Sequence, residues 1–306
     1  MNIKELGHRE KRFVSGHRSC AGCGFPTIVR NVLAGTKEPV VVSCATGCLE
    51  VTSTIYPFTS WKVPFIHSAF ENTSATISGV EATFKAFKKR GKLKENVKFV
   101  AFGGDGGTYD IGLQSLSGAL ERGHDFLYVL YDNEGYMNTG NQRSSATPYG
   151  ADTTTEPEGK LHHGKEEFRK DITKIAVAHN IPYIAQTACH AWNDTVMKAE
   201  KAFSIKGPKF INVLSPCTLN WKIDTSITVE ISRLATETCF WPLYEVENGK
   251  YKLNYRPKVK LPIEEFLRPQ GRFKHLFKPE NLHIIKKIQE NVDSEWKKLL
   301  KLCGES

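Results

Sequence analysis

The sequence predicts an α/β fold built on a mostly parallel, doubly wound sheet. Short segments rich in Val, Ile, Phe and Tyr alternate with segments of helical periodicity along the 306 residues. These apolar segments lack the strict alternation of half-exposed strands, as expected for strands buried on both faces. The expected strands are residues 40–43, 97–102, 126–131, 181–185 and 210–214.

Helices are expected between these strands. One apolar stripe recurs at i, i+4, i+7 and i+11, and Gly123 is well placed to end its helix. A second helical pattern covers residues 193–205 and stops at the Gly-Pro pair that follows. The stripe of the first helix consists of Tyr109, Leu113, Leu116 and Leu120.

The rest of the chain divides into a long loop and a distinct C-terminal part. Residues 134–170 show no periodic segment, and a loop of that length in a compact domain is more often functional than incidental. From about residue 240 the chain is basic and interrupted by Pro, and it ends in an amphipathic helix near residues 282–302. We therefore expect a domain over residues 1–240 and an extension over 241–306 that contacts a partner subunit.

Composition narrows the classes of protein. A hydrophobic content of 40% and a charged content of 25% are typical of globular proteins and exclude the disordered class. No apolar run approaches the ~20 residues of a membrane span, and the basic N-terminal segment precedes no apolar stretch, so a cytoplasmic location is expected. The net charge of +9 comes without a nucleic-acid-binding motif, which favours an acidic protein partner or anionic ligands over nucleic acid.

A glycine-rich turn at residues 103–107 follows the second expected strand and opens a helix. Glycines let backbone amides approach a phosphate, and a helix N-terminus favours an anion. Asp105 would repel a bare pyrophosphate, but it could bind a divalent cation that the pyrophosphate also binds. Asn133 follows the next strand, and ligands of open α/β sheets bind at the carboxyl ends of the strands. Asp105 and Asn133 are thus candidate Mg²⁺ ligands, with a glycine turn plus an Asx turn as the alternative.

Eight cysteines are many for a cytosolic chain, where they are more often metal-binding or catalytic than disulfide-bonded. Cys20 and Cys23 form a C-x-x-C pair, and Cys48 follows the first strand. Cys217, after the strand at 210–214, is our choice of fourth ligand. Four thiolates support a [4Fe–4S] cluster or zinc, although a zinc site usually has two close pairs. A redox-active dithiol at the C-x-x-C pair and unligated thiols are the remaining alternatives.

Long segments of the sequence resemble one known family. Asn133 lies 27 residues after Gly106, which is similar to the GDG-to-Asn signature of thiamine-diphosphate enzymes. The similarity reaches WPLYE near residue 241 and is to the thiamine-diphosphate-binding portion (β subunit) of pyruvate:ferredoxin oxidoreductases, within the 2-oxoacid:ferredoxin oxidoreductase family. The segments are GHRSCAGCG, CATGCLEVTSTIYPFTSWKVPFIHSAFEN, AFGGDGGTYDIGLQSLSGALERGH and YDNEGYMNTGNQRSSATPYGADTTTEP.

The resemblance implies a fold of the thiamine-diphosphate (pyrophosphate-domain) type and a set of site residues. The implied ligands of one [4Fe–4S] cluster are Cys20, Cys23, Cys48 and Cys217, and those of Mg²⁺ are Asp105, Asn133 and the carbonyl of Gly135. Asn138 is implied to face the substrate as a catalytic residue. The chain has Ser215 where relatives often have a cysteine, but it keeps the ligand position. The residues implied to line thiamine diphosphate are Cys48, Gly104, Asp105, Gly106, Gly107, Asn133, Glu134, Gly135, Tyr136, Met137 and Asn138.

The implied reaction is oxidative decarboxylation of pyruvate with coenzyme A to acetyl-CoA, CO₂ and reduced ferredoxin. Oxalate or another 2-oxoacid is the alternative substrate. A non-catalytic electron-transfer subunit and a non-redox thiamine enzyme with zinc are alternatives of other classes. The implied partners are an α-type subunit whose pyrimidine-binding domain brings a catalytic Glu, a γ-type subunit, a ferredoxin-like δ-type subunit and ferredoxin.

Overall fold

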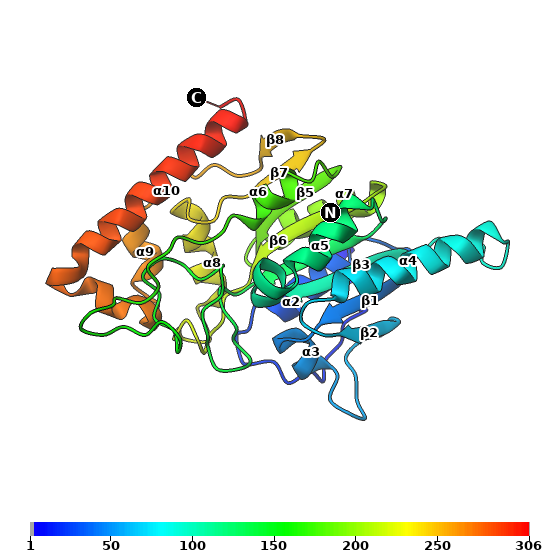
Figure 1. Cartoon of the computed structure of the whole chain (residues 1–306), viewed down its shortest axis with the longest axis horizontal. Coiled ribbons are helices and arrows are strands. Elements are labelled where there is room, and N and C mark those ends of the chain that lie inside the picture. The colour runs from blue at the N-terminus through cyan, green and yellow to red at the C-terminus, as the bar shows by residue number, and fades with distance from the viewer. Residues whose placement is uncertain (1–2, 306) are drawn as a thin grey trace.

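Eight strands form one sheet in the order β2-β1-β3-β4-β6-β5-β7-β8 in the computed structural model, which describes residues 3–305 (Figure 1). The strands β1 to β6 are parallel, β7 runs antiparallel to β5, and β8 runs antiparallel to β7. The strands are β1 Val40–Ala45, β2 Phe65–Ser68, β3 Lys98–Gly104, β4 Leu127–Asp132, β5 Tyr183–Ala188, β6 Lys209–Leu214, β7 Tyr244–Glu247 and β8 Lys250–Leu253. This confirms the mostly parallel sheet that the sequence predicts.

Helices cover both faces of the sheet, as in a doubly wound fold. Side chains of α2 and α7 pack on one face, and those of α4, α5 and α6 pack on the other. The helices are α1 Ile3–Gly7, α2 Phe25–Leu33, α3 Cys48–Ser53, α4 Thr73–Lys89, α5 Leu113–Glu121, α6 Ile172–Val177, α7 Trp192–Ser204, α8 Thr228–Glu237, α9 Ile263–Leu267 and α10 Leu282–Leu302. Three further helical segments are not α-helical. They are the π-helix η1 Gly106–Ile111 and the 3-10 helices η2 Gly271–Phe277 and η3 Pro279–Asn281.

The strand β4 shows why the central strands read as continuous apolar runs. Its alternate residues Leu127, Val129 and Tyr131 belong to the hydrophobic cluster under α2 and α7. The residues between them, Tyr128 and Leu130, belong to the cluster under α4, α5 and α6. Both faces of the strand are therefore buried, and burial on both faces removes the polar alternation of an exposed sheet.

All five predicted strands are present, but the sequence reading missed β2, β7 and β8. The hairpin between β7 and β8 turns at Asn248 and Gly249, whose φ angles are +48° and +79°. An Asn-Gly pair is the strongest short-range hairpin signal, so this turn could have been recognised. The edge strand β2 has only four residues and two exposed side chains, which leaves little apolar pattern to read.

The helical predictions are confirmed by α5, α7 and α10, and residues 133–171 contain no helix or strand. Gly123, which has a φ of +70°, follows the first of these helices. The division at residue 240 stays a prediction, although β7 and β8 beyond it extend the main sheet.

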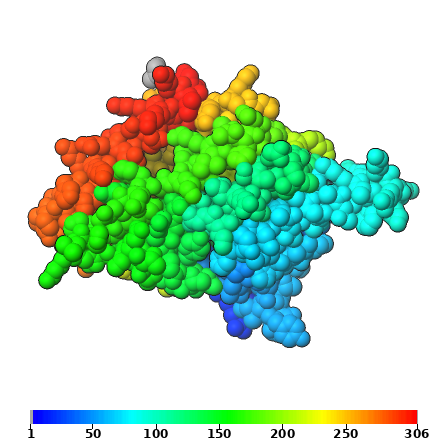
Figure 2. Space-filling model, in the orientation of Figure 1, coloured from blue at the N-terminus to red at the C-terminus, as the bar shows by residue number. Residues whose placement is uncertain are grey.

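Two helices shape the outline of the molecule. The C-terminal end of α4 projects as a lobe, and α10 runs along the opposite edge (Figures 1 and 2). The first half of α10 packs with α9 and η2, and its second half reaches the cluster under α6. Within residues 3–305, no helix combines the length and the apolar character that a membrane crossing requires.

Candidate active site

A narrow cleft opens at the carboxyl ends of β1, β3 and β4. Ligands of open α/β sheets bind at this edge because the loops after neighbouring parallel strands meet there. The loop after β1 contributes Thr46 to Cys48, the turn after β3 contributes Gly104 to Gly107, and the loop after β4 contributes the third side. The residues lining the cleft are Thr46, Gly47, Cys48, Phe70, Gly104, Asp105, Gly106, Gly107, Tyr131, Asn133, Gly135, Tyr136, Met137, Asn138 and Thr139.

The glycines of the turn are required by close packing. A Cβ atom on Gly106 would lie 2.3 Å from Cε1 of Tyr136, and one on Gly107 would lie 2.8 Å from the carbonyl oxygen of Phe70. The Tyr136 hydroxyl also donates a hydrogen bond to the carbonyl oxygen of Gly106 at 2.9 Å. The turn therefore has no room for a side chain at either position, because Tyr136 and Phe70 pack directly against its backbone.

Asp105, Asn133 and Gly135 converge on one point of the cleft. One terminal atom of the Asn133 amide lies 2.7 Å from Oδ1 of Asp105 and 3.0 Å from the carbonyl oxygen of Gly135. As an NH₂ group this atom donates to both oxygens. As the amide oxygen it completes a set of three oxygens. Oxygens that share one Mg²⁺ stand roughly 2.9 Å apart at neighbouring octahedral corners, so the spacing fits such a cation.

The carboxyl group of Asp105 is buried beside a second acidic side chain, Asp132. Its side chain is 1% exposed, and Oδ2 accepts a hydrogen bond from the Ser144 hydroxyl at 2.5 Å. Burial, reinforced by the charge of Asp132, raises the pKa of Asp105 well above its usual value. A buried carboxylate of this kind is stable when it takes up a proton or pairs with a cation.

Glu134, predicted to line the cofactor site, is not among the residues that line the cleft. Its φ of +67° turns the backbone between Asn133 and Gly135, a conformation that is uncommon for a residue with a side chain. The buried carboxylate forms ion pairs with Arg169 at 2.8 Å and Arg272 at 2.5 Å. The two guanidinium groups thus hold the backbone turn that presents its neighbours to the cleft.

The same support extends to the residues beside this turn. Arg169 also pairs with Asp132 at 2.6 Å, directly before Asn133 in the chain. The guanidinium of Arg272 lies 4.0 Å from the ring centroid of Trp221, whose indole N–H donates to the carbonyl oxygen of Asn133 at 2.8 Å. The loop after β4 is therefore fixed from behind by a buried network of charges and rings.

Tyr131 is a cleft residue that the sequence reading missed. Its buried hydroxyl has no hydrogen-bond partner within the described part of the chain. The hydroxyl stands 2.8 Å from where a Cβ atom of Gly47 would lie, between the loop after β1 and the turn after β3. A buried polar atom without a partner is uncommon, and here it lies in a cleft that would receive a polar ligand.

The four candidate cluster ligands are close enough to influence one another electrostatically, and one of them, Cys48, reaches the cleft. Burial, with repulsion from Cys217 and Cys20, raises the pKa of the Cys48 thiol to about 12. Burial also raises the pKa of Cys23, with contributions from the other three thiols. Cys48 itself lines the cleft.

The thiols do not make a complete metal site in the described chain. Across residues 3–305, no three His, Cys, Asp or Glu side chains form a group that could hold a metal ion. Three other cysteines, Cys44, Cys189 and Cys239, are buried in the hydrophobic clusters, as expected of packed thiols.

The structure brings together all but one of the residues predicted to line the cofactor site. Ten of the eleven residues expected to line the cofactor site lie in the cleft, and Glu134 is the exception. Ser144, Arg169 and Arg272 were missed because their partners are distant in the sequence and no motif marks them. Thr46, Gly47, Phe70, Tyr131 and Thr139 were also missed.

The chain is similar to known proteins over nearly its whole length. Residues 45–213 match the family model described as "Thiamine pyrophosphate enzyme, C-terminal TPP binding domain". Pyruvate synthase subunit PorB of Thermotoga maritima is 53% identical, over 99% of this chain and 96% of that protein. The subunit of the same name from Methanocaldococcus jannaschii is 51% identical, over 95% and 97%. Ketoisovalerate oxidoreductase subunit VorB of Pyrococcus abyssi is 45% identical, over 96% and 94%.

A solved structure supports the fold. The chain is similar to a 2-oxoglutarate:ferredoxin oxidoreductase from Magnetococcus marinus, with a TM-score of 0.56, 19% identity and coverage of 76% of this chain and 81% of that one. This likeness concerns the fold alone, whereas the identity to the PorB subunits extends over nearly the whole length. The chain therefore belongs to the thiamine-pyrophosphate-binding subunits of the 2-oxoacid:ferredoxin oxidoreductase family.

Proposed function

We propose that this chain is the subunit of a 2-oxoacid:ferredoxin oxidoreductase that holds thiamine diphosphate through Mg²⁺ beside a [4Fe–4S] cluster. The reaction is the reversible conversion of pyruvate and coenzyme A to acetyl-CoA and CO₂, with ferredoxin as electron acceptor. The observation that carries the proposal is the convergence of Asp105, Asn133 and Gly135 in a cleft that also contains Cys48.

The cleft residues fit a Mg²⁺-anchored pyrophosphate. Asp105 and Asn133 would supply side-chain oxygens and Gly135 its carbonyl oxygen, at the spacing that Mg²⁺ requires. The amides of Gly106 and Gly107 at the start of η1 would bind the phosphate oxygens. When bound, thiamine diphosphate supplies an electron sink for the pair of electrons left as CO₂ departs.

Asn138 would position the substrate. Its side chain is exposed and lines the cleft beyond the loop that holds Asn133. An amide at this place can donate a hydrogen bond to the carboxylate or the carbonyl oxygen of a 2-oxoacid. Asn138 would thus orient the bond to be broken, while the buried residues behind it hold the loop.

Cys20, Cys23, Cys48 and Cys217 would hold the cluster. Their mutual electrostatic influence supports a common site. Burial raises the pKa of Cys23, Cys48 and Cys217, and hydrogen bonds from backbone N–H groups oppose this rise at all three thiols. These N–H groups, at Leu219 and Asn220 for Cys217, would stabilise thiolate sulfur and tune the potential of a cluster. A [4Fe–4S] cluster supplies one-electron transfer, and Cys48 would place it beside the thiamine site.

The proposal requires partner subunits. An α-type subunit would bring the Glu of a pyrimidine-binding domain, a γ-type subunit would complete the complex, and a ferredoxin-like δ-type subunit would carry electrons to ferredoxin. The names of the relatives, which describe subunits, support this assembly. The eight free cysteines support a reducing compartment such as the cytoplasm.

Pyruvate is the proposed substrate because the relatives at 50–53% identity are named pyruvate synthase subunits. A relative named for ketoisovalerate is 45% identical. Oxalate is the second substrate to test. A screen of pyruvate, oxalate, 2-oxoisovalerate and 2-oxoglutarate with the native complex, measured by ferredoxin reduction, decides among them. Preference for an acid other than pyruvate would overturn this part of the proposal.

The cofactors are tested by iron, sulfide, zinc, magnesium and thiamine analysis of the anaerobically purified complex, with Cys217→Ser and Cys303→Ser variants. We expect about four irons and four sulfides at the site of this subunit. Cys217→Ser should damage this cluster and leave thiamine bound, whereas Cys303→Ser, on the far side of the fold, should preserve both. Zinc without sulfide would replace the redox proposal with the non-redox one. Absence of thiamine would favour an electron-transfer subunit.

A further inference from the structure

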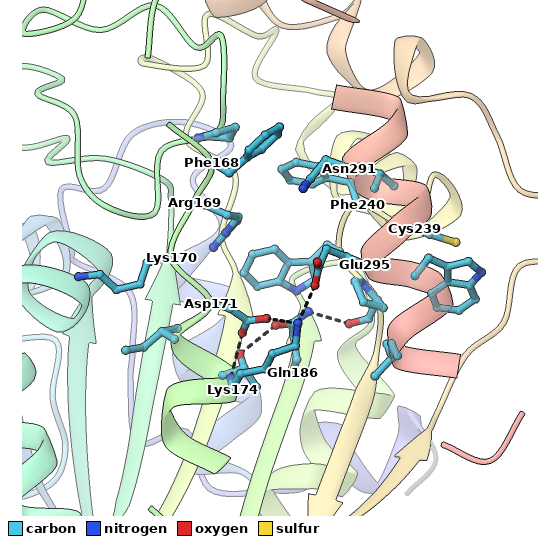
Figure 3. Close-up of a pocket in the computed structure, with 18 of the residues that line it drawn as sticks. Phe168, Arg169, Lys170, Asp171, Lys174, Gln186, Cys239, Phe240, Asn291 and Glu295 are labelled. Carbon is cyan, nitrogen blue, oxygen red and sulfur yellow. Dashed lines mark hydrogen bonds and ion pairs between the residues drawn. The ribbon is translucent and has the colours of Figure 1, made fainter. Parts of the chain in front are cut away.

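Arg169 lies between the loop after β4 and a separate cavity. This cavity, of about 420 Å³, lies between the sheet and α10, and none of its lining residues lines the cofactor cleft. Arg169 is on its wall, and Figure 3 shows it across from Asn291 and Glu295 of α10. The same guanidinium pairs with Asp132 and Glu134, so it belongs both to the cavity wall and to the support of the loop.

The cavity leaves one side of Arg169 without packing. Its side chain is 21% exposed, whereas the side chains of Asp132 and Glu134 are fully buried. Empty space beside a side chain removes the contacts that would keep it in place. The ion pairs to Nη1 and Nη2 fix one edge of the guanidinium, but they do not fix the plane of the group. A contact on the face of the guanidinium is therefore required to keep it from turning towards the cavity.

Trp241 makes this contact. Cζ of Arg169 lies 4.6 Å from the centroid of the Trp241 ring, closer than the 5.8 Å that separates it from the ring of Tyr109. A guanidinium over the face of a tryptophan is attracted by the ring electrons, most strongly where water is excluded. Trp241 also lines the cavity and is 2% exposed, so a buried ring covers the face that the ion pairs leave free.

The ring of Trp241 is itself fixed by hydrogen bonds around it. Its indole N–H donates to the carbonyl oxygen of Thr187 in β5 at 2.7 Å, and its backbone N–H donates to that of Ala235 in α8 at 2.8 Å. The carbonyl oxygen of the next residue, Pro242, accepts from the Gln186 amide of β5 at 3.0 Å. The segment WPLYE, which begins at Trp241, is therefore attached to the sheet and gives the guanidinium a rigid surface.

The second arginine that pairs with Glu134 is supported in the same way. Cζ of Arg272 lies 4.0 Å from the ring centroid of Trp221, whose indole N–H donates into the loop at Asn133. Each carboxylate oxygen of Glu134 thus meets a guanidinium that is stacked on a tryptophan. The repetition of this arrangement on both sides of one buried carboxylate indicates that the stacking serves the loop.

We propose that Trp241 is a positioning residue of the cofactor site. It holds Arg169 in the plane in which one guanidinium pairs with both Asp132 and Glu134, and these two residues flank Asn133 in the loop. The effect of Trp241 on the loop does not depend on the proposed function, whereas its effect on Mg²⁺ binding rests on that function. If the ring only filled space in the core, its removal would loosen the whole fold and not the loop in particular.

The test measures hydrogen–deuterium exchange in the complex depleted of Mg²⁺ and thiamine diphosphate. Exchange in residues 133–138 is divided by exchange in β4, which removes any change in global stability. We expect this ratio to rise on the order of 3–10-fold in Trp241→Leu, and less in Trp241→Phe, which keeps an aromatic face. Trp296→Leu removes an indole from the α10 side of the same cavity and should leave the ratio unchanged.

An unchanged ratio in the Trp241 variants, or an equal rise in Trp296→Leu, would overturn the proposal. Because Trp241 is buried, Trp241→Leu can fail to assemble. Trp241→Phe then decides alone, since a rise in its ratio supports the positioning role and an unchanged ratio refutes it.

Mg²⁺ affinity connects the loop with the cofactor. Mg²⁺ is titrated in reconstitution with thiamine diphosphate, and its Kd should rise on the order of 3–10-fold in Trp241→Leu, less in Trp241→Phe and not in Trp296→Leu. A faster-exchanging loop with an unchanged Kd would overturn the role of Trp241 at the cofactor site. An unmodified complex without Mg²⁺-dependent thiamine binding would instead overturn the proposed function, and the exchange ratio would still decide the role of Trp241 in the loop.

Discussion

Glu134 and Arg272 are 138 residues apart in the sequence, yet Oε2 of Glu134 lies 2.5 Å from Nη2 of Arg272 in the interior. The pair stands behind the loop after β4, on the side away from the cofactor cleft. Because Glu134 adopts a positive φ between two candidate Mg²⁺ ligands, its ion pairs fix the directions in which those ligands point. The loop is thus positioned by charges that do not themselves touch the cleft.

Replacing Arg272 with Lys tests this role. A lysine keeps the charge but loses the planar stacking on Trp221 and the fork geometry of the guanidinium. We expect the Kd for Mg²⁺ in cofactor reconstitution to rise on the order of 10-fold, with a stability loss of about 1–3 kcal/mol. Arg268→Lys, at an exposed arginine that stacks on Phe277, is the matched control. Equal Mg²⁺ affinity in the two variants would refute the positioning role.

Asp105→Asn separates cofactor binding from folding. The asparagine can keep its oxygen for the Asn133 N–H and donate its NH₂ group to the Ser144 hydroxyl oxygen, and it removes a charge that burial and Asp132 make unfavourable. We expect the cofactor-free protein to be as thermally stable as the unmodified one, or more so, and to lose most of its stabilisation by Mg²⁺ and thiamine diphosphate. Thermal denaturation with and without the two ligands measures this, and an undiminished ligand-induced shift would contradict the assignment of Asp105.

Many of the cleft residues could be predicted because they directly follow strands in the sequence. The turn at Gly104 to Gly107 and the loop at Asn133 to Asn138 each follow a buried strand, and parallel neighbours bring such loops together. The strands themselves were readable from their apolar composition. Sequence position and sheet geometry were therefore sufficient for the residues at strand ends.

The site residues that could not be predicted depend on the backbone conformation and on partners that are distant in the sequence. Glu134 was expected beside the cofactor because its neighbours are there, but its positive φ sends the side chain the other way. Arg169 and Arg272 are recognisable only from their contacts with Glu134, since a single arginine in a sequence carries no sign of its partner. Tyr131 looked like any other apolar residue of a strand, although it lines the cleft.

Two glycines should respond oppositely to alanine. At Gly79, within α4, a Cβ atom would meet nothing within 4 Å, so Gly79→Ala should stabilise the protein by about 0.5–1 kcal/mol through helix propensity. At Gly106, a Cβ atom would lie 2.3 Å from the Tyr136 ring, so Gly106→Ala should destabilise by about 1–3 kcal/mol and weaken thiamine binding. Denaturant unfolding and thiamine titration measure both effects. Tight thiamine binding in Gly106→Ala would contradict the requirement for glycine at this position.

His190 should make stability depend on pH below neutrality. Burial, with help from the charge of Arg233, lowers the pKa of His190 from 6.5 to about 4 in the folded protein. Above pH 6.5 the imidazole is neutral in both the folded and unfolded states. As the pH falls from 6.5 towards 4, the unfolded state gains a proton first, so this residue should remove about 2 kcal/mol of stability at pH 5.

His190→Asn retains a hydrogen-bonding group for the Ser232 hydroxyl without titrating. Unfolding free energies at pH 7 and pH 5 should therefore differ less in His190→Asn than in the unmodified protein or in His162→Asn, at a side chain that is 71% exposed. The same pH dependence in all three would show that His190 is not the responsible group.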